Sequence, residues 1–172
     1  MPFIVFAIAL LVVVIDQLIK YGCVYLFEIP FEQLDASVVN SVNVEKIELI
    51  PGLFSLTFVS NFNGALGLFA NLKWILVVFT IIAIGVLCWI VIKKKFTSKV
   101  FNISAALIIG GGIGNLIDRI VLGYVIDNLS ISFFPPVCNF ADYCVTVGAV
   151  LLAVFILFLY KPEKKNIGKD NE

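Results

Sequence analysis

Four long apolar stretches constrain the fold of this chain more than any other feature. A helix that crosses the hydrocarbon core of a bilayer needs about 20 consecutive apolar residues. Hydrophobic residues make up 61% of the 172 residues, and the mean hydropathy is +1.08. We therefore expect an all-α polytopic membrane protein, a bundle of four transmembrane helices in a single domain, residues 1–172. The expected spans are residues 3–22, 72–92, 100–122 and 141–160.

The first stretch is expected to stay in the protein rather than to be removed as a signal peptide. No basic region precedes its apolar run, and it carries Asp16 and Lys20 within the run. Charged side chains in a span mark a surface that faces the interior of the bundle. This face of the first helix should therefore pack against the other spans.

Lysines predict the orientation of the bundle. They gather after the second and the fourth stretch: Lys93, Lys94, Lys95 and Lys99, and Lys161, Lys164, Lys165 and Lys169. Cytoplasmic loops carry an excess of basic residues, so the loop 93–99, the tail 161–172 and the N-terminus should be cytoplasmic. The outer segments are then residues 23–71 and 123–140. No basic face remains for nucleic acid, which we exclude as a partner.

Carboxylates converge on the opposite side of the membrane. With this orientation, the outer ends of the spans and the outer connection hold four of them: Asp16, Asp118, Asp127 and Asp142. A charged side chain near hydrocarbon is costly and usually serves a function. The orientation was derived from lysines alone, so the convergence is independent evidence for a site at one face.

Each of these residues also has a purely structural explanation. Asp16 and Lys20 are i and i+4, which suits a neutralising pair on one helix face. Asn139 and Asp142 have the spacing of a capping box that begins the fourth helix. Asp127 lies in an alternating, extended stretch, where a lone Asp is usually a turn residue. Four glycines of the third stretch suit close helix packing or the approach of a substrate: Gly110, Gly111, Gly112 and Gly114.

The first outer segment contains one strand pattern. Residues 53–60 alternate apolar with polar side chains, and residues 61–64 (Asn-Phe-Asn-Gly) predict a turn. A plain β-hairpin explains this pattern without any chemistry. The polar stretch from Glu28 to Glu48 suggests no chemistry.

Two functions remain open on the residues alone. A pair of aspartates that share one proton can activate water for attack on an amide. Chains of carboxylates in spans also serve proton-coupled transporters or channels. No histidine is present, and the spacing of the four cysteines fits no metal site, so we expect no metal and no cofactor. Cys23 and Cys138 are both expected outside, but nothing in the sequence shows that they pair.

Five motifs in order resemble those of the lipoprotein signal peptidases, the type II signal peptidases of bacteria. They are Asp16-Gln17-Leu18-Ile19-Lys20; Asn61 with Ala65-Leu66-Gly67-Leu68-Phe69; Gly114-Asn115-Leu116-Ile117-Asp118-Arg119; Val125-Ile126-Asp127; and Asn139-Phe140-Ala141-Asp142. Each motif is weak alone, but together they cover nearly the whole chain, in order and on the expected spans.

The resemblance implies an aspartic endopeptidase of the bacterial cell membrane. It implies substrates that are diacylglyceryl-modified prolipoproteins, cleaved on the amino side of the lipobox cysteine, and a small extracytoplasmic β-cradle at the membrane lipids. We expect a monomer. The motifs place the catalytic dyad on Asp127 and Asp142, with Asp118 as the rival candidate. Supporting residues fall on Asp16, Lys20, Asn61, Gly114, Asn115, Asp118, Arg119, Asn139 and Ala141.

The sequence departs from the family pattern near these motifs. Asn63 stands where the family usually has Gly, Leu66 where an aromatic is expected, and Asn128 and Cys138 where Phe is usual. We expect the changes to affect the shape of the substrate site and not the dyad itself. They put substrate preference in doubt more than the reaction.

Overall fold

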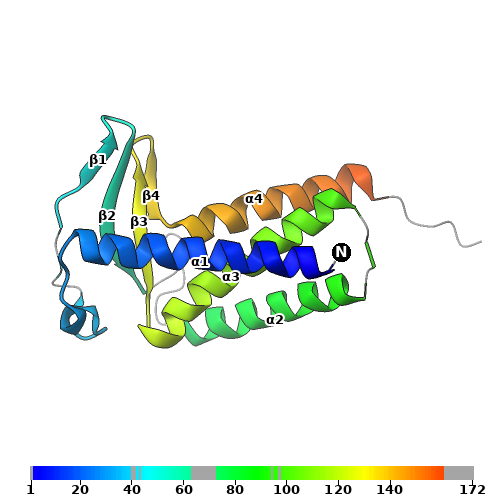
Figure 1. Ribbon diagram of the computed structural model, residues 1–172, viewed down its shortest axis with the longest axis horizontal. Helices are drawn as coiled ribbons and strands as arrows, with labels where there is room; N and C mark the ends of the chain where they lie inside the picture. The colour runs from blue at the N-terminus through cyan, green and yellow to red at the C-terminus, as the bar shows by residue number, and fades with distance from the viewer. Residues whose placement is uncertain are drawn as a thin grey trace, which may run out of the picture.

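The computed structural model consists of a four-helix bundle with a β-sheet at one end. It describes residues 2–39, 42, 44–62, 73–93, 95–96 and 98–160. Figure 1 shows the sheet standing at the end of the bundle that is remote from the N-terminus. We call the end of the bundle that carries the sheet the sheet end. The opposite end, where Lys93, Lys95 and Lys99 lie, is the lysine end.

Four helices are long and apolar enough to cross a membrane. They are α1 (Pro2–Leu26), α2 (Lys73–Ile92), α3 (Lys99–Val121) and α4 (Phe140–Val154), which continues as a π-helical turn, Phe155–Leu159. Each helix coincides with one of the four expected apolar stretches. Three of them agree within a residue or two, and residue 72 lies outside the described residues.

The predicted end of the first span is wrong by one turn of helix. We expected an end at Gly22, but α1 continues to Leu26, so the connecting segment begins after Leu26 and not at Cys23. Cys23 and Val24 are 3% exposed. Their burial under the sheet explains why the helix continues past the glycine, whose helix-breaking tendency is worth only about 1 kcal/mol.

The glycines of α3 allow the other helices to approach closely. A Cβ atom on Gly110 would lie 2.7 Å from the carbonyl oxygen of Ala9 in α1, and one on Gly111 would lie 2.5 Å from that of Ala141 in α4. One on Gly112 would lie 3.1 Å from Ile84 of α2. Helix packing therefore accounts for these three positions, and none of them is left as a surface for substrate.

The sheet is antiparallel with the order β1-β2-β3-β4. Its strands are β1 (Ile47–Ile50), β2 (Phe54–Asn61), β3 (Val125–Ile131) and β4 (Phe134–Cys138). The expected strand 53–60 and the extended stretch after Gly123 are confirmed. β2 pairs with both β1 and β3, so it is not an isolated hairpin. The rest of the predicted turn, with Asn63 and Leu66, lies outside the described residues.

The pairing of β2 with β3 positions two site residues. Val59 lies opposite Asp127, and Asn61 lies opposite Val125. Side chains of directly paired residues project from the same face of an antiparallel pair. Asn61 and Asp127 therefore share one face, two positions apart along the ladder.

The face of the sheet opposite Asn61 and Asp127 covers an apolar core of its own. The Tyr124 hydroxyl donates to the carbonyl oxygen of Leu34 at 3.1 Å, which ties β3 to a 3₁₀ turn, Phe31–Leu34. The stretch from Glu28 to Glu48 therefore contributes part of this core. Its buried members are Val24, Ile29, Leu34, Val39, Phe58, Tyr124 and Ile126. This core fixes the position of β3, and hence of Asp127, against α1.

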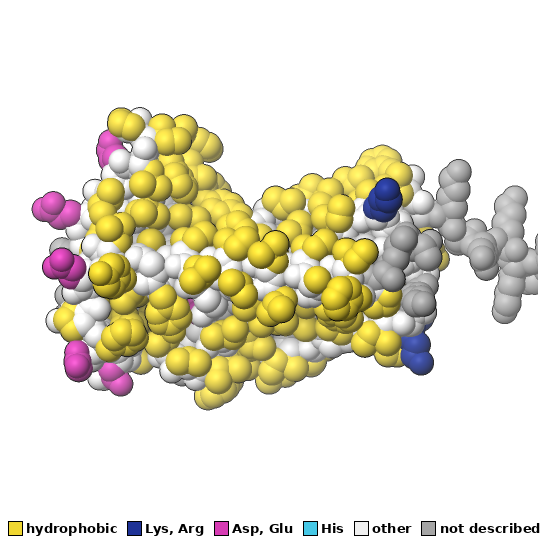
Figure 2. Space-filling view, viewed as in Figure 1, with side chains coloured by type: hydrophobic (Ala, Val, Ile, Leu, Met, Phe, Trp, Pro, Cys, Tyr) yellow, Lys and Arg dark blue, Asp and Glu magenta, His cyan; other side chains and the backbone are white. Residues whose placement is uncertain are grey.

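The surface separates apolar from charged side chains. Figure 2 shows hydrophobic side chains over the helices, acidic ones at the sheet end and basic ones at the lysine end. Large exposed apolar surface on a monomer marks a membrane or protein contact. With four helices of spanning length, a bilayer explains this surface.

Candidate active site

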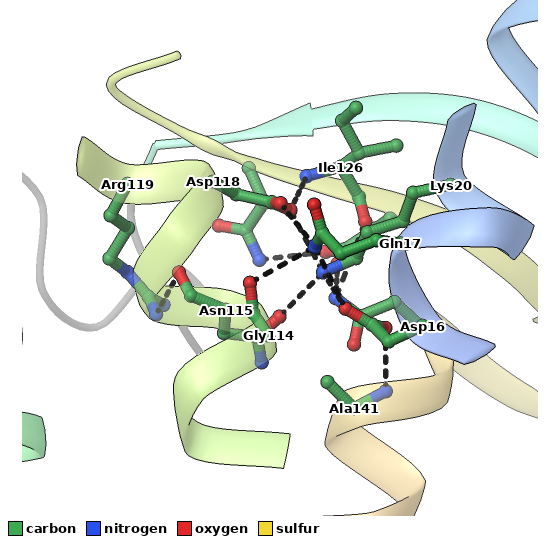
Figure 3. Close-up of polar contacts among 12 residues, drawn as sticks. Asp16, Gln17, Lys20, Gly114, Asn115, Asp118, Arg119, Ile126 and Ala141 are labelled. Carbon is green, nitrogen blue, oxygen red and sulfur yellow. Dashed lines mark hydrogen bonds and ion pairs between the residues drawn. The ribbon is translucent and has the colours of Figure 1, made fainter. Parts of the chain in front are cut away.

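The site lies at the sheet end, where α1, α3 and the start of α4 meet strand β3. Figure 3 shows Asp16, Gln17 and Lys20 of α1 pointing toward Asn115 and Asp118 of α3. All eleven predicted site residues belong to one connected set of contacts, which Gln17 completes by linking Gly114 to the rest.

A buried lysine joins the first and third helices. The Lys20 Nζ lies 2.8 Å from Asp16 Oδ2 and 2.8 Å from Asp118 Oδ2. Asp16 and Lys20 are 0% exposed and Asp118 is 1% exposed. The expected pair of Asp16 and Lys20 is confirmed, and it extends to a second carboxylate. An ammonium between two carboxylates suits a buried site, where an unpaired charge is strongly disfavoured.

Both oxygens of Asp118 are occupied by donors. Besides Lys20, Oδ2 accepts the backbone N–H of Ile126 at 3.1 Å, and Oδ1 accepts the Gln17 amide at 3.0 Å. Asp118 thus ties α3 to α1 and to strand β3. A carboxylate held in this way has little capacity left to bind a water and a substrate.

Asn139 connects Asp127 with Asp142. Its Nδ2 donates to Asp127 Oδ1 at 2.7 Å, and its Oδ1 accepts the backbone N–H of Asp142 at 2.9 Å. Asp142 Oδ2 in turn accepts the backbone N–H of Asn139 at 3.3 Å. The predicted capping box is therefore confirmed. The same local motif that begins α4 also fixes the two carboxylates relative to each other.

Each of these two carboxylates receives one more side-chain donor. Asn61 Nδ2 donates to Asp127 Oδ2 at 2.8 Å, and Asn115 Nδ2 donates to Asp142 Oδ1 at 2.7 Å. The Asn61 amide therefore contacts a carboxylate of the predicted dyad directly.

The environment of Asp127 favours its protonated form. Burial, followed by the nearby charge of Asp142, raises the pKa of Asp127 to about 7, against the opposing effect of the Asn61 and Asn139 hydrogen bonds. Asp127 is 2% exposed. One of the two carboxyl groups can therefore hold a proton near neutral pH, which acid–base chemistry requires.

Gly114 and Ala141 leave room for Asp16. A Cβ on Gly114 would lie 2.6 Å from Asp16 Oδ2 and 3.4 Å from the Cβ of Ala141. The backbone N–H of Ala141 donates to Asp16 Oδ1 at 2.9 Å. Small residues at both positions let α1, α3 and α4 meet around one carboxylate.

Arg119 supports the site from its edge. Its guanidinium donates to the carbonyl oxygen of Asn115 at 3.3 Å. Within the described part of the chain it forms no direct ion pair. It still lies near enough to Asp142, Asp127 and Asp118 to interact with their charges.

One polar residue, Gln17, was missed as a site member, and another, Asn128, lies buried behind the site. Gln17 follows Asp16 in the first motif, and an amide inside an apolar run was the signal that could have identified it. Asn128 is 0% exposed on the face of β3 opposite Asp127, and its Nδ2 lies 3.4 Å from Cys23 Sγ. Cys23 and Cys138 are both free thiols, so the disulfide that we considered does not form.

Comparison with known proteins shows the family. A family model described as signal peptidase (SPase) II matches residues 8–158. The chain belongs to the signal peptidase II family. The matched range contains every residue of the hydrogen-bonded set. Members of this family are aspartic peptidases, which requires a pair of carboxylates such as the one described above.

Named relatives and solved structures extend the match to almost the full chain. A lipoprotein signal peptidase of Halothermothrix orenii is 36% identical over 93% of this chain and 97% of its own. One of Streptococcus thermophilus is 42% identical over 68% of this chain and 75% of its own. A bacterial membrane enzyme solved by the in meso method has a TM-score of 0.74 at 25% identity, over 96% of this chain and 94% of that one. This chain is therefore a multi-pass membrane enzyme.

Proposed function

We propose that this enzyme removes signal peptides from prolipoproteins by cleaving on the amino side of a diacylglyceryl-modified cysteine. The substrate class comes from the similar proteins, whose names describe lipoprotein signal peptidases. Asp127 and Asp142 are the catalytic dyad in this proposal. The residues Asp16, Lys20, Asn61, Gly114, Asn115, Asp118, Arg119, Asn139 and Ala141 support them.

The observation that carries the assignment is the contrast between Asp118 and the other two aspartates. Asn139 holds Asp127 and Asp142 together, and this arrangement suits a shared proton. Asp118 instead accepts a lysine, a glutamine and a backbone N–H. It is suited to bracing, not to proton transfer.

The dyad would act as a base and an acid on the two sides of one peptide bond. The Asp142 carboxylate takes a proton from water, and the resulting hydroxide bonds to the scissile carbonyl carbon. Protonated Asp127 donates its proton to the developing oxyanion, and the proton passes to the leaving nitrogen as the C–N bond breaks. The products are a signal peptide with a carboxyl terminus and a lipidated cysteine with a free amine.

The orientation follows from the distribution of charge. Exposed Lys93, Lys95 and Lys99 lie at the lysine end, which the positive-inside rule assigns to the cytoplasm. The dyad then lies near the outer face of the cell membrane. A signal helix that is still in the bilayer, with its lipidated end at the surface, presents its scissile bond at this level. The proposed active unit is a monomer.

The transporter alternative has less support. A proton path needs polar side chains through the whole depth of the membrane. In the described chain, every buried charged or amide side chain belongs to the sheet end: Asp16, Lys20, Asn115, Asp118, Asp127, Asn128 and Asn139. Toward the lysine end the buried hydroxyl of Ser104 donates to its own helix, at the carbonyl oxygen of Phe101.

The proposal is tested by cleavage in lipid bilayers. The purified protein is mixed with a prolipoprotein peptide that carries diacylglyceryl on its lipobox cysteine, and with the same peptide lacking the lipid. Mass spectrometry should find a new amine on the lipidated cysteine and no cut in the unmodified peptide. Absence of cleavage would refute the proposed reaction, and equal cleavage of both peptides would refute the substrate class.

A further inference from the structure

Lys20 has one more contact than its two ion pairs require. Its Nζ donates to Asn115 Oδ1 at 2.9 Å, in addition to Asp16 and Asp118. The side chains of Lys20 and Asp16 are 0% exposed. An ammonium carries three N–H donors and no acceptor. The third donor is therefore used on a neutral amide of the neighbouring helix and not on water.

This contact determines which way the Asn115 amide points. Because the ammonium can only donate, the atom of Asn115 that faces it must be the carbonyl oxygen. The NH₂ group must then face the other way, where its Nδ2 lies 2.7 Å from Asp142 Oδ1. The NH₂ group can only donate, so the facing oxygen of Asp142 must accept.

The remaining oxygen of Asp142 also faces a donor. Its Oδ2 accepts the backbone N–H of Asn139 at 3.3 Å. Asp142 therefore has a donor on each oxygen, and it lies in the first turn of α4, where the helix dipole favours negative charge. The chain of contacts runs from the ammonium through an oriented amide to one particular member of the dyad.

We propose that Lys20 is a positioning residue for the reaction, which acts through the Asn115 amide to keep Asp142 ionised as the base. The inference rests on the proposed function and adds the control of the proton to it. Asp127 also receives a donor on each oxygen, from Asn61 and Asn139. What distinguishes Asp142 is that its side-chain donor, the Asn115 amide, is bound to the Lys20 ammonium, and this assigns the shared proton to Asp127. Hydrogen bonds with an ionised partner are roughly twice as strong as neutral ones, so a polarised amide favours a carboxylate over a carboxylic acid.

Five other charged or titratable groups lie near Asp142, one from each of α1, α3, β3, β4 and α4. They are Lys20 of α1, Arg119 of α3, Asp127 of β3, Cys138 of β4 and Tyr143 of α4 itself. Arg119 also favours the ionised form of Asp142, but it donates to the backbone carbonyl oxygen of Asn115 and not to the Asn115 amide group that links Lys20 with Asp142. The Lys20 charge also acts on Asp142 directly, and only the part of its effect that passes through Asn115 should be lost in the Asn115→Leu background.

The rival explanation is that Lys20 only neutralises Asp16 and Asp118. A purely structural lysine would change the amount of folded enzyme or the rate by one factor at every pH. A lysine that keeps Asp142 ionised would change the pH at which the base becomes protonated. The pH profile therefore separates the two explanations.

A double-mutant cycle on the full-length protein tests the chain of contacts from Lys20 through Asn115 to Asp142. The variants are Lys20→Met, Asn115→Leu and the double variant, with kcat/KM for the lipidated peptide measured across pH. Each single variant should move the acid limb to higher pH by about one unit, as expected for the loss of a charge-assisted hydrogen bond. In the Asn115→Leu background, Lys20→Met should add less than half of the shift that it causes alone.

The control is Lys46→Met, which removes an exposed ammonium that contacts only Ser130 of the sheet among its described hydrogen bonds. Its profile should match the intact protein. If Lys20→Met does not fold, the double variant Asp16→Asn/Lys20→Met takes the place of Lys20→Met in the cycle. It removes one negative and one positive charge, so the net charge of the cluster is unchanged.

A parallel loss of activity at every pH, or fully additive shifts, would overturn the inference. Failure of the intact protein to cut the peptide would instead refute the proposed function, so the two failures are distinguishable.

Discussion

Replacing Asn61 with leucine should move the alkaline limb of the cleavage profile to higher pH. The proposed mechanism needs Asp127 protonated, and burial raises its pKa to about 7, so the intact enzyme should lose kcat/KM above about that pH. The Asn61 amide donates to Asp127 Oδ2 at 2.8 Å and thereby lowers this pKa. Its removal should raise the pKa of Asp127 further and keep the acid protonated at higher pH.

The size of the shift follows from the hydrogen bond. A bond to a charged group contributes about 1.5–3 kcal/mol, and each pKa unit corresponds to about 1.4 kcal/mol, so the shift should be about one to two units. Asp127 is 2% exposed, so solvent screening removes little of the effect. A lower catalytic rate at the optimum would not affect this test, because the direction of the shift depends on the lost donor.

The assay is kcat/KM for a lipidated prolipoprotein peptide in bilayers between pH 5 and pH 9. Asn102→Leu, the same exchange in the first turn of α3 at the lysine end, is the matched control and should leave the limb in place. An alkaline limb that stays unchanged or moves to lower pH in Asn61→Leu would refute the assignment of the acid to Asp127.

Further predictions concern stability. Gly114→Ala should destabilise the enzyme by about 1–3 kcal/mol, because the new Cβ would lie 2.6 Å from an Asp16 oxygen that is held by Lys20. Gly85→Ala, whose new Cβ would meet no atom of the described residues outside its own stretch of helix within 4 Å, should unfold at an equal or higher temperature. Asn128→Leu should raise the unfolding temperature, because Asn128 Oδ1 is buried without a partner among the described residues, which costs about 1–3 kcal/mol. A lower unfolding temperature for Asn128→Leu, or equal effects of the two glycine variants, would contradict these explanations.

The parts of the fold that depend on local spacing were predictable from the sequence. Apolar length placed the four spans, and alternation placed β2 and most of β3. The Asp16–Lys20 pair and the Asn139–Asp142 capping box involve residues three or four positions apart, so helix geometry alone brings them together.

The long-range contacts of the site were not predictable in the same way. Lys20 and Asn115 are separated by 95 positions, and their contact depends on how closely α1 packs on α3. The strand β1 was missed because all four of its residues are exposed, so it lacks the alternation of a half-buried strand. The carry-over of family motifs named the site residues, but it could not say which oxygen faces which donor.

In the proposed mechanism Asp127 and Asp142, and not Asp118, perform the chemistry. This assignment is tested most directly by single-turnover cleavage of the lipidated peptide by Asp127→Asn, Asp142→Asn and Asp118→Asn, each checked for folding by its unfolding temperature. The first two should stay folded and lose about 10²–10⁴-fold in rate, the usual contribution of a general acid or base. Asp118→Asn should unfold at a lower temperature and retain partial activity. A folded Asp118→Asn without activity, beside an Asp127→Asn that still cleaves at the rate of the intact enzyme, would contradict the assignment.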